Sequence, residues 1–112
     1  MTPFRFPRPG EEALIIGIIN LSPESFYGAS RCGTLEQALN VAEKMIEEGA
    51  DILDIGAESS RPGSAPLSEQ EELNRLLPIV IKLAEIIPIP ISVDTYKPAV
   101  AHEVLNAGAS II

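Results

Sequence analysis

Three apolar segments of this sequence lead into polar side chains that could bind a ligand. Asn20 follows "LIIGII" and Asp94 ends "ISVD". Asp54 of "DILDIG", together with Glu58, is expected at the end of the second strand. Sites in parallel-strand folds form where the strands end, so we expect these side chains to face one common edge. Two carboxylates near an amide oxygen suit a hydrogen-bond-donating ligand or a hard cation, whereas the alternative for each acid is a cap on a loop or helix.

Two loops carry further residues with possible chemical roles. In "ESSRPG", Arg61 has a planar fork that can bind a carboxylate or phosphate, and a surface ion pair is the alternative. Ser59 and Ser60 could be ligands, although such hydroxyls taken alone more often stabilise turns. The other loop, "NLSPESFYG", carries Phe26 and Tyr27, which could cover a flat ring or pack the loop onto the sheet.

Composition limits the classes of partner. The 112 residues carry a formal net charge of −8, which disfavours nucleic acid and anionic membranes because both need clustered Lys and Arg. The lone Cys32 excludes an internal disulfide, and the lone His102 is expected on a helix surface. No apolar run approaches ~18 residues, and the start lacks the apolar core of a signal peptide. We therefore expect a cytoplasmic protein.

The apolar pattern predicts strands that alternate with helices. Strands are expected at 14–19, 51–56 and 91–94, and the first is expected to be covered on both faces because it is continuously apolar. The final "ASII" is expected to begin a fourth strand. Residues 1–13 are expected to form an irregular leader, and 14–112 a partial domain of βα units.

Caps and breakers predict the helix boundaries. Capping boxes place helix starts at Thr34 and Ser68, and Gly49 is expected to end the first of these helices. Pro78 is expected to kink or split the second helix. A third helix is expected from about Pro98 to Asn106, before Gly108. The apolar face of the second helix is expected at Leu73, Leu76, Leu77, Val80 and Ala84.

The order of elements predicts an α/β fold. Either a doubly wound open sheet or a (β/α)8 barrel produces it. The first loop lacks the G-x-G-x-x-G fingerprint and is long, which favours the barrel. A complete barrel needs ~250 residues, so we expect an N-terminal part of about three and a half βα units. Its unpaired strand edges should promote self-association.

Three segments resemble one family. "GIINLSPESF", "DILDIGAESSRPG" and "ISVDTYK", in this order, are similar to dihydropteroate synthase, a pterin-binding (β/α)8 barrel family of folate biosynthesis. The resemblance implies a transferase that joins 6-hydroxymethyl-7,8-dihydropterin diphosphate to para-aminobenzoate and releases diphosphate. It also implies magnesium as cofactor and a homodimer for the full-length protein.

The resemblance implies a role for each matching residue. Asn20 corresponds to the asparagine that helps hold magnesium and the diphosphate, Asp94 to the aspartate that binds the pterin ring, and Asp54 to an aspartate near the pterin floor. Asn20 and Arg61 are the catalytic candidates. The para-aminobenzoate side is implied to include Ser60, Arg61, Pro62 and Phe26, while Gly28 stands where the family has a second loop aspartate.

Two alternatives remain at this point. One is a pterin-binding domain that presents methyltetrahydrofolate to a corrinoid for methyl transfer, and the other is a non-catalytic pterin-binding fragment. The "SSRPG" segment favours the synthase. We expect the 112-residue chain alone to be inactive, because the family's later site residues lie beyond these motifs.

Overall fold

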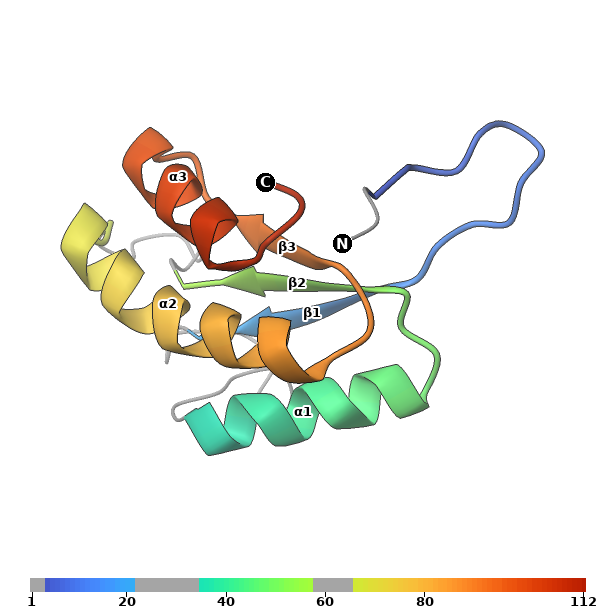
Figure 1. The fold of residues 1–112 in the computed structure, drawn as a ribbon, viewed down its shortest axis with the longest axis horizontal. Helices are drawn as coiled ribbons and strands as arrows, with labels where there is room; N and C mark the ends of the chain where they lie inside the picture. Colours follow the sequence, from blue (N-terminus) through green and yellow to red (C-terminus); the bar gives the residue numbers. More distant parts are fainter. Residues whose placement is uncertain (1–3, 22–34, 58–65) are drawn as a thin grey trace.

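Strands and helices alternate in the computed structural model, which describes residues 4–21, 35–57 and 66–112. Figure 1 shows the arrangement. The elements are β1 (Ile16–Asn20), α1 (Leu35–Glu47), β2 (Ile52–Gly56), α2 (Glu69–Ile86), β3 (Ile91–Asp94) and α3 (Pro98–Ala107).

The strand order identifies the architecture. The three strands are parallel and lie in the order β1-β2-β3. A parallel bridge between Ser92 and Ile111 places the chain after α3 beside β3. In both common doubly wound folds the strand order reverses near β1, so four consecutive neighbours do not occur there. The fold is therefore the first three and a half βα units of a (β/α)8 barrel, as predicted.

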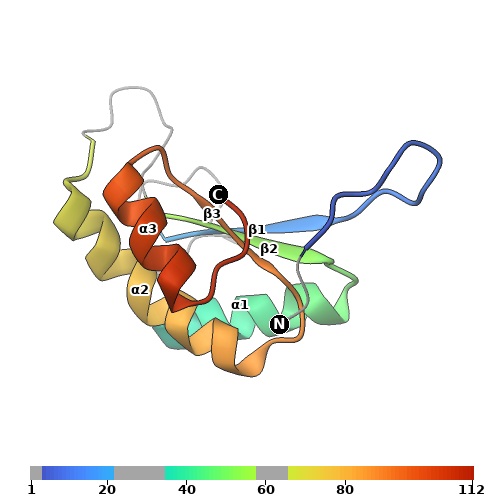
Figure 2. The same cartoon turned by 45° about the horizontal axis from the view of Figure 1, so that its top comes forward.

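All three helices lie on one side of the sheet (Figures 1 and 2). Successive strand residues point to opposite faces, so the positions facing the helices form the core. Ile19, Leu53 and Val93 are fully buried there. On the opposite face Ile16 and Ile18 are 50% and 59% exposed. The expectation that the first strand is covered on both faces is therefore wrong for the described residues, because every described helix packs on the same side.

Helix α1 ends where Gly49 was expected to end it. Gly49 has a φ of 107°, which L side chains rarely adopt. Its N–H donates to the carbonyl of Ile46, and the N–H of Ala50 donates to that of Met45. These two bonds form a Schellman motif, which satisfies carbonyls that the helix leaves unpaired. The predicted capping box at Thr34 lies outside the described residues.

Helix α2 begins with the predicted capping box. The Ser68 hydroxyl accepts from the Glu71 N–H at 3.1 Å, and the Glu71 carboxylate accepts from the Ser68 N–H at 3.4 Å. Pro78 lies inside the helix without splitting it. Proline has no N–H to donate to the carbonyl of Asn74, four residues earlier in the helix. Pro78 and Asn74 are both exposed, so water can bond to that carbonyl.

The buried face of α2 includes the predicted residues and extends beyond them. Leu76 and Val80 are fully buried, and Leu73, Leu77 and Ala84 are partly buried and pack against the core. One acidic residue, which was not expected, is also buried. The buried residues of the helix are Glu72, Leu76, Ile79, Val80 and Leu83.

The remaining described segments agree with the sequence pattern. Pro98 is the first residue of α3, and Gly108 follows the helix with a φ of 124°. Residues 4–13 contain neither helix nor strand, and in Figure 1 they form a loop that runs out from β1 and turns back. Two contacts of 3.0 Å between Arg5 and Glu11 hold this leader in a turn. Among the described residues, no helix has the length and apolarity needed to cross a membrane.

Candidate active site

The strand register brings Asn20 and Asp94 to the same level. Asn20 pairs with Gly56 in β2, and Gly56 pairs with Asp94 in β3. Residues in register across a parallel sheet project to the same face, which here is the face of Ile16 and Ile18. The amide of Asn20 and the carboxylate of Asp94 therefore share the carboxyl edge of the sheet, away from the helices.

Gly56 leaves the level between these two residues free of a side chain. A Cβ at Gly56 would lie 3.6 Å from the Asp94 Cβ and 3.9 Å from its Oδ2. The Asp94 side chain thus leans over the middle strand, and the floor beside it is backbone. Sequence reasoning missed Gly56, although a glycine at the end of an apolar strand signals close approach by a ligand.

Asp54 lies one layer deeper than predicted. It is in the interior of β2, in register with Ile18 and Ser92, and not at the strand end. The Ser92 hydroxyl donates to Asp54 Oδ1 at 2.7 Å. Ser92 was also missed, although it lies two residues before Asp94 and therefore on the same face of β3.

The environment of Asp54 disfavours its charge. Burial raises the pKa of this carboxyl above the ordinary value, the hydrogen bond from Ser92 lowers it, and the nearby charge of Asp94 raises it. A carboxyl perturbed by burial and by a second carboxylate is typical of functional sites. The hydrogen bond occupies Oδ1 and leaves Oδ2 able to accept from a ligand.

Helix α2 contacts both connections that follow the site strands. Arg75 Nη1 donates to the carbonyl of Ala57, directly after β2, at 3.3 Å. Lys97 Nζ, directly before α3, lies 2.6 Å from Glu72 Oε1. Sequence reasoning missed these residues. The signal was present, because Glu72 lies four residues before Leu76 on the buried stripe.

The other predicted site residues lie outside the described residues. These are Phe26 of the first loop and Ser60, Arg61 and Pro62 of the second, together with Glu58. His102 is exposed, as expected, and contacts Asn106 at 3.2 Å.

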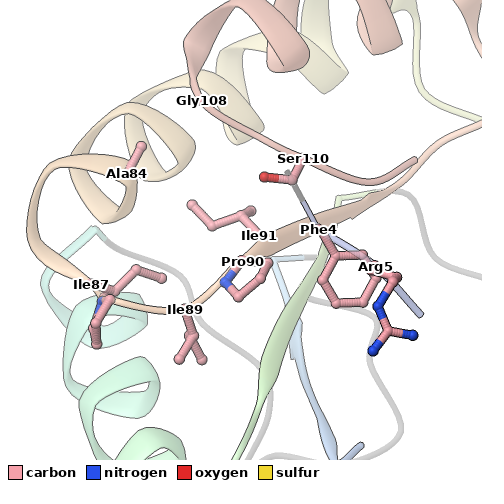
Figure 3. A pocket seen from close by; sticks show the side chains of 10 residues that line it. Phe4, Arg5, Ala84, Ile87, Ile89, Pro90, Ile91, Gly108 and Ser110 are labelled. Atoms are coloured by element: carbon pink, nitrogen blue, oxygen red, sulfur yellow. The ribbon is translucent and has the colours of Figure 1, made fainter. Parts of the chain in front are cut away.

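A cavity of about 420 Å³ lies at the opposite end of the sheet, where β3 begins. Figure 3 shows mostly aliphatic side chains around it, together with Phe4 and Arg5 of the leader and Ser110 after α3. Arg5 already binds Glu11 through two hydrogen bonds. The cavity therefore offers fewer polar side chains to a ligand than the carboxyl edge, which carries Asn20, Asp54 and Asp94.

The donor groups at the carboxyl edge limit how a metal could be held. Within residues 4–21, 35–57 and 66–112, no group of three or more His, Cys, Asp or Glu could hold a metal ion. Mg²⁺ commonly uses one or two protein oxygens and takes its other ligands from water and substrate phosphates. Asn20, with one amide oxygen at the strand end, fits a site of that kind.

The fold and site define a (β/α)8-type chain with a polar cluster at the carboxyl edge, and comparisons with known proteins identify its family. The model of the pterin binding enzyme family matches residues 16–112. The chain belongs to this family.

Its relatives are dihydropteroate synthases. The Bacillus subtilis enzyme is 47% identical over 102 residues, covering 91% of this chain and 36% of that protein. The Yersinia pestis enzyme, solved with a sulfonamide drug, superimposes with a TM-score of 0.80 at 47% identity, covering 86% of this chain and 35% of that one. The Coxiella burnetii enzyme, solved with pteroic acid, gives 0.78 at 49% identity, covering 86% and 33%. The chain thus spans about a third of the length of these three enzymes.

Proposed function

We propose that this chain forms one wall of a dihydropteroate synthase active site, the wall that binds the pterin diphosphate. The observation that carries the proposal is the alignment of Asn20, Gly56 and Asp94 across three strands. The dihydropteroate synthase relatives support it. A pterin-binding methyltransferase would also fit the description of the family. No observation favours a methyltransferase over a synthase.

Asp94 binds and orients the pterin. Its exposed carboxylate can accept two N–H bonds from the 2-amino-pyrimidinone edge of the ring, as carboxylates do with planar donors. The bare backbone at Gly56 leaves room for a flat ring beside it. Asp54 Oδ2 can accept a further hydrogen bond from below, while Ser92 holds Oδ1.

Asn20 serves the diphosphate side of the site and would hold Mg²⁺ through its amide oxygen. Bound magnesium would supply positive charge that stabilises the departing diphosphate. In the reaction the bond from the pterin methylene carbon to the diphosphate oxygen breaks, the arylamine nitrogen bonds to that carbon, and the amine loses a proton. The Asp94 carboxylate also favours positive charge that develops on the pterin. Ser60, Arg61, Pro62 and Phe26 are proposed for the para-aminobenzoate side by their motifs alone.

A chimaera tests this function. Residues 16–112 of this chain would replace the matching third of the Bacillus subtilis synthase, which completes the barrel. We expect diphosphate release only when both dihydropterin diphosphate and para-aminobenzoate are present. Asp94→Asn in the grafted part should lower kcat/KM by roughly 10- to 100-fold, because hydrogen bonds to a charged group are lost.

The matched control is Glu85→Gln at the other end of α2, which should retain full activity. Turnover without para-aminobenzoate, or an unchanged Asp94→Asn variant, would contradict the proposal. Binding of methyltetrahydrofolate without binding of para-aminobenzoate would favour the methyltransferase. The 112-residue chain alone is expected to bind the pterin without turnover. The cytoplasmic location and the homodimer stay predictions.

A further inference from the structure

We infer that the first turns of α2 position the site: the ion pair between Glu72 and Lys97 fixes the connection from β3 to α3, and with it the carboxylate of Asp94. The importance of Asp94 rests on the proposed function, whereas the positioning itself is a property of the ligand-free chain. In Figure 1 the first turn of α2 lies at the end of the molecule toward which the strand arrows point.

The Glu72–Lys97 pair is enclosed by protein. Lys97 Nζ lies 2.6 Å from Glu72 Oε1, and the two side chains are 13% and 2% exposed. A buried ion pair contributes little net stability compared with apolar side chains of similar volume, because both charges lose their hydration. A buried Glu72 carboxylate without its lysine would be costly, however, so positions of Lys97 that keep Nζ within reach of Glu72 Oε1 are favoured. The pair therefore restricts where Lys97 can lie.

Further contacts transmit this position to Asp94. Only residues 95–97 separate β3 from α3. Within them, the Lys97 N–H donates to Thr95 Oγ1 at 3.3 Å, and Lys97 Nζ lies 4.5 Å from the centre of the Tyr96 ring. Pro98, with its fixed φ, follows at once. Lys97 is thus held at both its backbone and its side chain, three residues after Asp94.

Arg75 gives α2 a second contact of the same kind. Its Nη1 donates to the carbonyl of Ala57, a fully buried residue directly after β2. Glu72 and Arg75 are three residues apart and so lie on neighbouring parts of one helix surface. One rigid helix thus holds the exits of β2 and β3, the strands that carry Asp54 and Asp94.

The test compares variants of the 112-residue chain without ligand. Lys97→Met leaves Glu72 buried and unpaired, and Glu72→Gln/Lys97→Met removes both charges. We expect Lys97→Met to lower the melting temperature and the double variant to recover most of it. In both variants the NMR order parameters of residues 94–97 should fall from about 0.85 to below about 0.6. The double variant would then regain its melting temperature while residues 94–97 stay mobile. If the ion pair only stabilised the fold, these residues would become ordered again in the double variant.

Glu85→Gln is the matched control, because Glu85 makes an exposed pair with Lys82 at 3.8 Å on the same helix. It should leave residues 94–97 unchanged. If Lys97→Met does not fold, Lys97→Arg, which keeps the charge but alters its geometry, should shift the Asp94 amide resonance at a nearly unchanged melting temperature. Unchanged order parameters in the double variant, or an unshifted Asp94 in Lys97→Arg, would overturn the inference.

Pterin binding then separates this inference from the proposed function. In chains that bind pterin, Lys97→Met should weaken binding by roughly ten-fold or more, because a small misplacement of a binding group has a large effect. If the unaltered chain binds no pterin, the proposed function fails while the order parameters still decide the positioning. If pterin binds equally well to the Lys97→Met variant, the positioning inference fails and the proposed function stands.

Discussion

The two faces of one three-stranded sheet differ in their share of polar side chains. The helix-side face carries apolar residues such as Leu53, Ile55 and Val93, all fully buried. The open face carries Asp54 and Asp94 in the same strands, one residue out of phase with them. Adjacent positions of a strand thus have different roles. The apolar residues of the helix-side face pack against the helices, and the acidic residues of the open face are available to a ligand.

Residues that stabilise the fold and residues proposed to bind the ligand therefore alternate along each strand. Burying a Leu, Ile or Val side chain contributes about 1.5–3 kcal/mol, so the helix-side face supplies much of the folding free energy. The open face contributes differently, because burial raises the pKa of Asp54 and its charge is therefore disfavoured there. Substitutions at neighbouring positions should consequently affect different measurements.

The largest difference between the faces is expected for matched truncations to alanine. Leu53→Ala removes a fully buried side chain of the core and should lower the free energy of unfolding by about 3 kcal/mol. Ile18→Ala on the open face, where Ile18 is 59% exposed, should lower it by less than about 0.5 kcal/mol. Urea denaturation of both variants measures the contrast. Equal losses would mean that the open face is covered in solution.

Two glycines provide a smaller, sharper comparison. A Cβ at Gly17 would lie 2.8 Å from Met45 Sδ and 3.3 Å from Leu53 Cδ2, so Gly17→Ala should destabilise by about 1 kcal/mol while Met45 shifts. Gly56→Ala meets only ordinary contacts with Asp94, so its stability should be unchanged or slightly higher.

The order of the two glycine variants should reverse when pterin binding is measured in place of stability. Gly56→Ala places a methyl group beside Asp94 and between it and Asn20, so it should weaken pterin binding. Gly17→Ala should leave binding intact at temperatures where the protein is folded. Loss of stability in Gly56→Ala, with unchanged binding, would contradict the division between the faces.

The smallest expected effect is the pH dependence of Asp54→Asn. Burial raises the pKa of Asp54 in the folded chain, so the folded state binds more protons than the unfolded state. The stability contributed by Asp54 is therefore complete below its unfolded pKa and is lost as pH rises through the folded pKa. Asp54→Asn lacks this loss and should be more stable at pH 7 by less than about 1 kcal/mol, since the site is partly solvated.

Thermal unfolding across acidic to neutral pH measures this effect. The difference between Asp54→Asn and the unaltered chain should grow as pH rises. A difference that shrinks with rising pH would show that Asp54 is stabilised in its charged form. Ser92→Ala is a useful companion, because it removes the hydrogen bond that favours the charge.

Local signals predicted the elements well. Gly49 and Ser68 mark helix boundaries through hydrogen bonds between neighbouring residues, and Pro98 does so through its fixed φ; the structure places all three as expected. The third strand has the predicted bounds, and the first two differ by two residues or fewer at each end. These features depend on short-range chemistry, which a sequence states directly.

Features that depend on distant packing were less predictable. Pro78 does not split α2, and both it and Asn74, four residues earlier, are exposed to water. Glu72 is buried because a lysine 25 residues away accompanies it. The depth of Asp54 follows from strand register, which an apolar run cannot specify. The predicted self-association stays a prediction that the exposed Ile16 and Ile18 support.

Titration of the 112-residue chain with the dihydropterin diphosphate, followed by NMR, tests the central claim most directly. The side-chain amide of Asn20 and the backbone amide of Asp94 should shift together and saturate with one dissociation constant. Resonances around the distant cavity, such as those of Ile89 and Ser110, should not move. Shifts confined to that cavity, or separate titrations of the two strand-end residues, would contradict a shared pterin site.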